Sequence, residues 1–133
     1  MKVVIDTNVF ISGVFFTGPP SKVLEAWRDQ RVTVVISPDI FEEYRRVCDV
    51  LTAQFPSIDI EQILELLANN SEIVSPEDLP IPVCEDPDDD KFLSCALKGG
   101  ASVIISGDKH LLKVSGYKGL QIISPRKFVD DYL

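Results

Sequence analysis

Acidic side chains recur at positions where an α/β protein would need them for chemistry. Five carboxylates come from four separate segments of the 133-residue chain: Asp6, Glu43, Asp86, Asp89 and Asp108. A cluster of like charges is unstable without a cation, and an all-oxygen ligand set favours Mg²⁺ or Mn²⁺ over Zn²⁺. Such ions activate water and stabilise in-line attack at phosphorus. The residue types therefore predict metal-dependent phosphate chemistry.

Two of these acids follow predicted strands. Asp6 ends the apolar run Lys2–Asp6, and Asp108 follows the strand Ser102–Ser106 after the turn residue Gly107. Sites in open α/β sheets form at the carboxyl ends of strands, so both positions favour a site. Both acids could instead cap the next helix, where Asp is strongly preferred. For Asp6, position alone supports the two interpretations equally.

Helical geometry distinguishes Glu42 from Glu43 by the direction in which each side chain points. They lie in a predicted helix whose apolar stripe centres between Ile40 and Tyr44. At ~100° per residue, Glu42 points away from the core and Glu43 lies on the flank of the stripe, beside the sheet. The alternative for Glu43 is an ion pair with a neighbouring arginine, which is worth little on a surface.

The densest acidic run covers residues 85–90, with five acids in six positions. Asp86 could be an N-cap and Asp89 its reciprocal acid. The helix dipole accounts for one or two acids at ~0.3–1 kcal/mol each, but not for five beside a single lysine. The angular count directs Asp89 toward the sheet, where a charge needs a partner or a metal, whereas Asp88 and Asp90 point further out.

Apolar strands alternate with amphipathic helices and must position these acids. Strands are predicted at Lys2–Asp6, Val32–Ile36, Glu72–Ser75, Ser102–Ser106 and Leu120–Ser124. Helices are predicted from the breaker cluster at 18–21 to about residue 30, and over 38–51, 59–67, 88–99, 108–114 and 125–132. Residues 8–16 are ambiguous, with a short helix or turn broken at Gly13, and Gly99-Gly100 caps the helix before it. This alternation predicts a parallel sheet covered on both faces.

Length and composition set the class of the protein. A chain of 133 residues with 45% apolar and 26% charged residues is typical of one globular domain over residues 1–133. No stretch approaches ~20 consecutive apolar residues, which excludes a membrane-spanning helix, and the first residues lack a signal-peptide core. Cys48, Cys84 and Cys95 form no C-x-x-C pair, so we expect reduced thiols in a cytoplasmic protein.

The net charge of −8 is distributed unevenly. Residues 47–90 carry 12 acids and no Lys or Arg, whereas residues 91–133 carry 3 acids and 7 bases. A negative overall field opposes non-specific binding of nucleic acid. A polyanion would bind over the basic side chains of the last third, namely Lys91, Lys98, Lys109, Lys113, Arg126 or Lys127. The acidic middle is either a solubilising surface or a surface for a basic partner chain.

At these residues the chain resembles PIN-domain ribonucleases over nearly its whole length. The resemblance rests on Val3–Asn8, on Ser37-Pro38 followed by Glu43, on Asp86–Leu93 and on Ile104–Leu112, in that order. It implies a Rossmann-like α/β/α sandwich with a central, mainly parallel five-stranded sheet. It also implies a Mg²⁺- or Mn²⁺-dependent endonuclease acting on single-stranded RNA. The chain is most similar to PIN proteins assigned as toxins of toxin–antitoxin pairs, which implies an antitoxin partner and is compatible with a homodimer.

The resemblance also implies roles for individual residues. The catalytic, metal-binding acids map to Asp6, Glu43, Asp89 and Asp108, with Asp86 as an additional metal ligand. Asn8 would hold a metal-bound water or orient Asp6, and Ser106 keeps a hydroxyl where many relatives have Thr. Because Glu42 stands beside Glu43, the resemblance leaves open which of the two is the second acid. His110 is interpreted as a surface residue, with a contact to RNA or the leaving group as the alternative.

Three other functions stay open from the sequence. A phosphotransfer domain would use Asp6 as nucleophile, but the residue two positions later is Asn8 and not a second Asp. A receiver-like switch would need a phospho-acceptor Asp after a middle strand, which the sequence does not place. A non-catalytic binding module would keep the fold and hold a basic partner. Affinity for Mg²⁺ or Mn²⁺ separates that module from the enzyme.

Overall fold

The structure is a computed structural model that describes residues 1–133. Its five strands form one sheet in the order β3-β2-β1-β4-β5, and every neighbouring pair is parallel. The strands are β1 (Lys2–Ile5), β2 (Thr33–Ile36), β3 (Glu72–Ile73), β4 (Val103–Ile105) and β5 (Gln121–Ile123). The predicted Rossmann-like α/β architecture is confirmed, and the sheet is parallel throughout.

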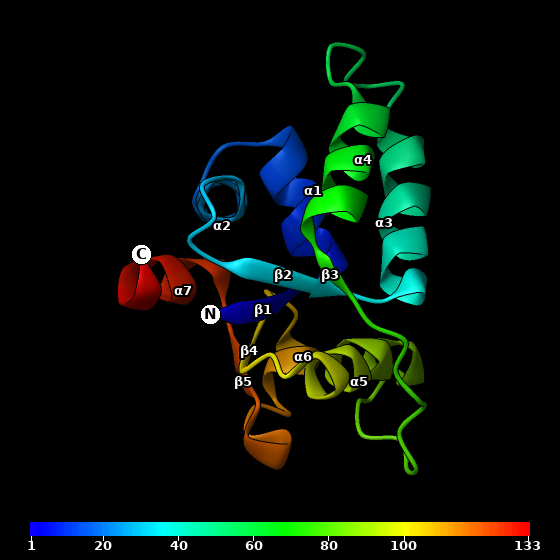
Figure 1. The fold of residues 1–133 in the computed structure, drawn as a ribbon, viewed down its shortest axis with the longest axis vertical. Helices are drawn as coiled ribbons and strands as arrows, with labels where there is room; N and C mark the ends of the chain where they lie inside the picture. The colour runs from blue at the N-terminus through cyan, green and yellow to red at the C-terminus, as the bar shows by residue number, and fades with distance from the viewer.

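Helices cover both faces of this sheet. They are α1 (Thr7–Phe15), α2 (Pro19–Arg28), α3 (Pro38–Leu51), α4 (Ile60–Asn70), α5 (Asp90–Gly99), α6 (Lys109–Leu112) and α7 (Pro125–Tyr132), with short 3₁₀ turns η1 (Pro87–Asp89) and η2 (Tyr117–Gly119). Figure 1 shows α1 to α4 on one side of the sheet and α5 on the other, where α5 packs against β1, β2 and β4. No helix is long and apolar enough to cross a membrane.

The central strand β1 explains where the site forms. Val3, Val4 and Ile5 are all buried, because strands covered on both faces need apolar side chains throughout. Ile5 pairs with Ile105 of β4, and the Asp6 amide donates to the Ile105 carbonyl at 3.0 Å. The polar residues that follow β1 and β4 are therefore brought together at one edge of the sheet.

The N-terminal helix differs from the prediction of a break at Gly13. Residues Thr7–Phe15 form one continuous helix that includes this glycine. A Cβ atom at Gly13 would lie 2.7 Å from Leu24 Cδ1 and 2.8 Å from the Pro20 carbonyl oxygen. The glycine therefore allows α1 and α2 to pack closely, and tertiary packing outweighs its low helix propensity.

The end of α5 refines the prediction for Gly99-Gly100. Gly100 is the C-cap, with φ at 69° in the left-handed region that favours glycine. Gly99 is the last helical residue, and a Cβ there would lie 2.4 Å from Val35 Cγ1. The first glycine thus lets α5 approach β2, and only the second ends the helix.

Candidate active site

Asp6 occupies the carboxyl end of β1 and is 7% exposed. Its Oδ2 atom accepts a hydrogen bond from Ser106 Oγ at 2.6 Å, and its side chain makes no cap bond to α1. Burial raises the pKa of Asp6, hydrogen bonds from Ser106 and the Thr7 backbone lower it, and the charges of Asp108 and Glu43 raise it again. Asp6 is thus the N-cap residue of α1 by position, but its side chain makes no capping bond and is buried beside other acids.

Ser106 connects Asp6 to Asp108. Its side chain is fully buried, and its hydroxyl oxygen accepts from the Asp108 amide at 3.0 Å while donating to Asp6. Asp108 caps α6 through one oxygen, Oδ1, which accepts from the His110 amide at 2.8 Å. Its second oxygen has no hydrogen bond, so capping leaves half of this carboxylate available.

Asp89 lies at the junction of η1 and α5 and is half-buried. Its side chain makes no hydrogen bond, so the predicted reciprocal bond with Asp86 does not form. Burial raises the pKa of Asp89 to about 6, and the charges of Asp6, Asp86, Asp108 and Asp88 contribute to this rise. As the angular count predicts, Asp89 points inward and interacts electrostatically with the acids at the ends of β1 and β4.

The other acids of the 85–90 run have local partners. Asp86 is exposed and caps η1, because its Oδ1 accepts from the Asp88 amide at 3.0 Å. Asp90 was expected to point outward, and this is wrong. Its two carboxylate oxygens accept from the amides of Cys84 at 2.8 Å and Val83 at 3.1 Å, so it turns back to close the preceding loop.

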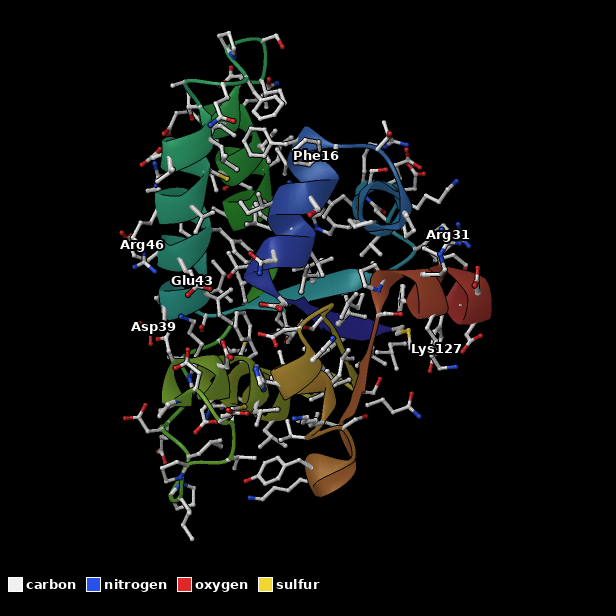
Figure 2. The ribbon with its side chains drawn as sticks, turned by 180° about the vertical axis from the view of Figure 1, so that it is seen from behind. Phe16, Arg31, Asp39, Glu43, Arg46 and Lys127 are labelled. Carbon is white, nitrogen blue, oxygen red and sulfur yellow. The ribbon has the colours of Figure 1, made fainter.

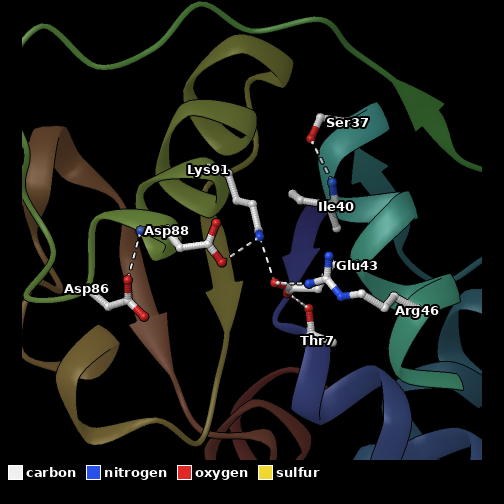
Figure 3. Close-up of polar contacts among 8 residues, drawn as sticks. All are labelled: Thr7, Ser37, Ile40, Glu43, Arg46, Asp86, Asp88 and Lys91. Atoms are coloured by element: carbon white, nitrogen blue, oxygen red, sulfur yellow. Dashed lines mark hydrogen bonds and ion pairs between the residues drawn. The ribbon is translucent and has the colours of Figure 1, made fainter. Parts of the chain in front are cut away.

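Glu43 lies beside this edge of the sheet, whereas Glu42 is exposed, as helical geometry predicts. The Glu43 Oε1 atom lies 2.7 Å from Lys91 Nζ and 3.7 Å from Arg46 Nη2, and Oε2 accepts from the Thr7 hydroxyl (Figure 3). Both oxygens of Glu43 are therefore already engaged by side chains of the protein. Figure 2 shows Glu43 and Asp39 on the side of the molecule opposite Arg31 and Lys127.

Lys91 has a role that differs from the expected contact with a polyanion. Its Nζ atom also lies 3.0 Å from Asp88 Oδ2, and its side chain is only 15% exposed. Burial alone would lower the pKa of Lys91, but the bonds with Glu43 and Asp88 outweigh it and raise that pKa. Lys91 is thus a counter-ion inside the molecule. The only sequence signal for this role was its position as the single base beside five acids.

The residues expected to support the acids differ in whether they contact the candidate site. Asn8 is exposed and makes no side-chain hydrogen bond, so Ser106 and not Asn8 orients Asp6. His110 is exposed and pairs through Nδ1 with Glu85 at 2.7 Å, in agreement with a surface position. Tyr44, which the sequence suggested only as core, is fully buried and donates its hydroxyl to the Ile5 carbonyl just before Asp6.

The acids fit a divalent cation in type, although they do not form a complete coordination sphere. No group of three or more His, Cys, Asp or Glu side chains is arranged to hold a metal ion, so the expected meeting of five ligands is not present. In addition to burial, the charge of Asp108 nevertheless raises the pKa of Asp6, and the charges of Asp6 and Asp108 raise that of Asp89. A bound cation would remove that repulsion, and carboxylate oxygens suit Mg²⁺ or Mn²⁺.

A cleft of about 590 Å³ adjoins this edge, on the side of α3 and Lys91. Asp6, Asp89 and Asp108 do not line it. Six of the residues that line it are acidic, namely Asp39, Glu42, Glu43, Asp78, Asp88 and Asp90. Its two basic residues, Arg46 and Lys91, both pair with Glu43. The cleft is therefore electronegative and disfavours a phosphate backbone.

Comparisons with known proteins agree with this architecture. A sequence model of the family described as "PIN domain" matches residues 2–110, a span that includes all five acids. The uncharacterized protein MJ1680 of Methanocaldococcus jannaschii is 32% identical over an alignment of 145 residues. The alignment covers 99% of this chain and 92% of that protein. The chain belongs to the PIN-domain family. PIN domains are generally nucleases, which is the class of enzyme that acids at this edge of the sheet would serve.

Proposed function

We propose that this protein is a metal-dependent endoribonuclease that cleaves single-stranded RNA. The observation that carries the proposal is the buried Asp6 carboxylate, which has no cationic partner and is repelled by Asp108 and Glu43. A buried acid next to other acids is a costly arrangement unless a cation compensates it. Membership of a nuclease family supports phosphodiester hydrolysis as the chemistry that this cost serves.

Asp6, Asp89 and Asp108 are the residues that would hold Mg²⁺ or Mn²⁺, with Asp86 as a further ligand at the exposed side. When bound, the ion supplies activation of water and neutralisation of charge at the phosphate. Ser106 keeps Asp6 in place through its 2.6 Å hydrogen bond. The amide of His110 fixes one oxygen of Asp108 and leaves the other free. Asp89, which makes no side-chain hydrogen bond, is the acid freest to adjust to a bound ion.

The charge distribution supports a proposal for the side from which RNA would approach. Residues 109–129 contain no acid, and Lys109, Lys113 and Lys118 in this segment are exposed and form no ion pair. Lys127, which the sequence suggested as a further contact, pairs instead with Asp131 at 2.7 Å. We propose that the RNA strand lies over α6 and η2 and avoids the acidic cleft. Phosphate contacts of this kind dominate affinity and weaken with salt.

Cleavage of labelled single-stranded RNA tests the proposal. We expect product with Mn²⁺ or Mg²⁺ and none with EDTA. We expect Asp6→Asn to lower the rate by more than about 100-fold, since replacing a residue that merely orients a ligand already costs 10–100-fold. Asp49→Asn, on the exposed part of α3, is the matched control. Cleavage in EDTA, or full activity of Asp6→Asn, would show that the site is assigned wrongly.

A second candidate function is a non-catalytic module that holds a basic partner chain. The acidic cleft beside Glu43 is the observation that favours it. Such a module need not bind Mn²⁺, so calorimetry with Mn²⁺ alone separates it from the nuclease. The role of toxin, with an antitoxin as partner, is supported by sequence resemblance, and co-purification with the product of a neighbouring gene would test it.

A further inference from the structure

We infer that Tyr117 and Lys118 form a subsite for one nucleotide of the RNA strand, away from the phosphate that is cleaved. The Tyr117 ring stacks on a base of the RNA, and the Lys118 ammonium group contacts the adjoining phosphate. The inference rests on the proposed function, because it identifies a contact of that same substrate. Both residues lie in a turn over residues 116–119 that contains η2, and we call it the Tyr117 turn.

The backbone of the Tyr117 turn carries a side chain where glycine is favoured. Gly116, Lys118 and Gly119 all have φ in the left-handed region, at 100°, 47° and 83°. Lys118 is one of only two non-glycine residues of the chain in that region, where a side chain is strained. The Gly119 amide donates to the Gly116 carbonyl at 3.0 Å, and the Leu120 amide donates to the Tyr117 carbonyl at 2.9 Å. The turn is therefore ordered by hydrogen bonds, and a strained residue in an ordered turn is a candidate for function.

The Tyr117 side chain has fewer partners than the other two tyrosines. The rings of Tyr44 and Tyr132 each stack on a phenylalanine, and their hydroxyls both donate hydrogen bonds within the protein. The Tyr117 ring is half-buried against the core and stacks on no other ring. It lies beside Lys118, whose Nζ atom is 5.6 Å from the ring centroid. An exposed lysine side chain can move away from the ring, so a base can take its place there.

The ring and the free cation together favour unpaired nucleic acid as the ligand. Lys118 is exposed and forms no ion pair, and residues 109–129 contain no acid in a chain whose net charge is −8. Proteins bind single strands by stacking bases on aromatic rings while cations contact the phosphates. Bases in a duplex are already stacked on one another, so the Tyr117 ring selects nucleotides that are unpaired. An acidic partner protein would use the cation but would leave the ring without a role.

The Tyr117 turn lies at the end of the sheet opposite the candidate site. It precedes β5 and so adjoins the amino ends of the parallel strands (Figure 1, orange turn below β5), whereas Asp6 follows the carboxyl end of β1. A strand of three residues, such as β5, is about 10 Å long. Lys109 and Lys113 lie between the two places in the chain and are exposed. RNA that reaches both places must therefore be longer than the two nucleotides joined by the scissile phosphate.

Removal of the ring gives the first test, by fluorescence anisotropy of labelled single-stranded RNA in EDTA, where no cleavage is expected. The RNA has about 12 nucleotides, within the ~4–16 that single-strand-binding modules cover. We expect Tyr117→Ala to weaken binding about 10-fold, as when other stacking rings are replaced by alanine. Tyr117→Phe should bind as the wild type does. An RNA of the same length without bases should bind the wild type and Tyr117→Ala equally.

Removal of the strained lysine gives the second test, because stability and binding should change in opposite directions. Lys118→Gly relieves the backbone strain, so we expect the melting temperature to rise by about 3 °C. It also removes a phosphate contact, so RNA binding should weaken about 3-fold and the salt dependence should lose about one unit of slope. Gln30→Gly is the matched control. Gln30 is the other strained residue, with φ at 62°, and is exposed after α2, so its replacement should raise the melting temperature without changing RNA affinity.

The outcomes separate this inference from the proposed function. Wild-type affinity of either Tyr117→Ala or Lys118→Gly would overturn the inference, because each residue is assigned a contact with the strand. If Tyr117→Ala fails to fold, Tyr117→Leu keeps an apolar side chain against the core without a ring and gives the same test. Wild-type protein that neither binds nor cleaves RNA would overturn the proposed function as well. Cleavage by the wild type with no loss of affinity in the variants would overturn the inference alone.

Discussion

Two groups of acids lie at the same edge of the sheet and differ in what compensates their charge. In the first group, which we call the Lys91 network (Thr7, Glu43, Asp88 and Lys91), Glu43 and Asp88 share an ammonium group whose side chain is 15% exposed. In the second group, which we call the Asp6 cluster (Asp6, Asp89, Asp108 and Ser106), no acid forms an ion pair. Burial, with a further contribution from neighbouring acids, raises the pKa of Asp6 and Asp89, whereas Lys91 lowers the pKa of Asp88. The same residue type is thus structural in one group and available for chemistry in the other.

The comparison shows how to assign function to an acid in an acidic segment. Distance from the sheet edge does not separate the two groups, since Asp88 and Asp89 are adjacent in the chain. The presence of a counter-ion does separate them, because a compensated carboxylate contributes to stability and an uncompensated one costs free energy. Residues that persist in a costly state are candidates for function.

The largest effect on stability should come from breaking the Lys91 network. Glu43→Ala removes the buried partner of Lys91, and we expect the free energy of unfolding to fall by about 3 kcal/mol, the order found when one member of a buried pair is removed. Glu42→Ala, one residue away and exposed, should stay within about 0.5 kcal/mol of wild type. Urea unfolding of the two variants measures the difference. Equal stability of Glu43→Ala and Glu42→Ala would contradict the distinction between the Lys91 network and the Asp6 cluster.

A smaller effect should come from the hydrogen bond that supports the Asp6 cluster. Ser106→Ala removes the donor to Asp6 Oδ2 and the acceptor of the Asp108 amide. We expect a loss of about 2 kcal/mol at pH 7, as for a hydrogen bond to a charged group. Ser102→Ala, at an exposed position just before β4, is the control in the same urea experiment. Wild-type stability of Ser106→Ala would mean that Ser106 does not support Asp6.

Most of the fold could be predicted because it depends on local patterns. The apolar runs before Asp6 and Ser106 predicted buried parallel strands. The helix predicted over 38–51 matches α3, where the Ser37 hydroxyl accepts from the Ile40 amide at 3.4 Å. The break expected at Gly13 failed because the reason for that glycine is Leu24 of another helix. A contact between elements is not encoded in local propensity.

The candidate site was predictable in position but not in pairing. The angular count directed Asp89 toward the sheet and placed Glu43 on the flank of the apolar stripe, and both side chains are half-buried in the structure. No local pattern predicts that Lys91 of α5 contacts Glu43, which is 48 positions away in the chain. Asp90 was misplaced for the same reason, because its partners are the backbone amides of a loop. Ion pairs and loop closures depend on tertiary structure, and they decide which acids are free.

The finest test of the comparison is the pH dependence that Asp89 imposes on stability. Its pKa of about 6 in the folded protein lies above the ordinary aspartate pKa of 3.8, so the protonated carboxyl is the form that the fold favours. Its contribution is complete below about pH 4 and is lost as the pH rises toward 6. Asp89→Asn keeps a neutral side chain. We therefore expect its melting temperature to rise relative to that of the wild type as the pH increases from about 4 to 6. Because Asp89 is half-exposed, solvent screening should keep the corresponding gain in the free energy of unfolding at or below about 1 kcal/mol.

Saturating Mn²⁺ should make the wild type more stable than Asp89→Asn at pH 7, since binding stabilises only a protein that keeps its ligands. A constant difference between the two proteins from pH 4 to 7 would show that Asp89 is not under repulsion, and the contrast with Asp88 would then fail.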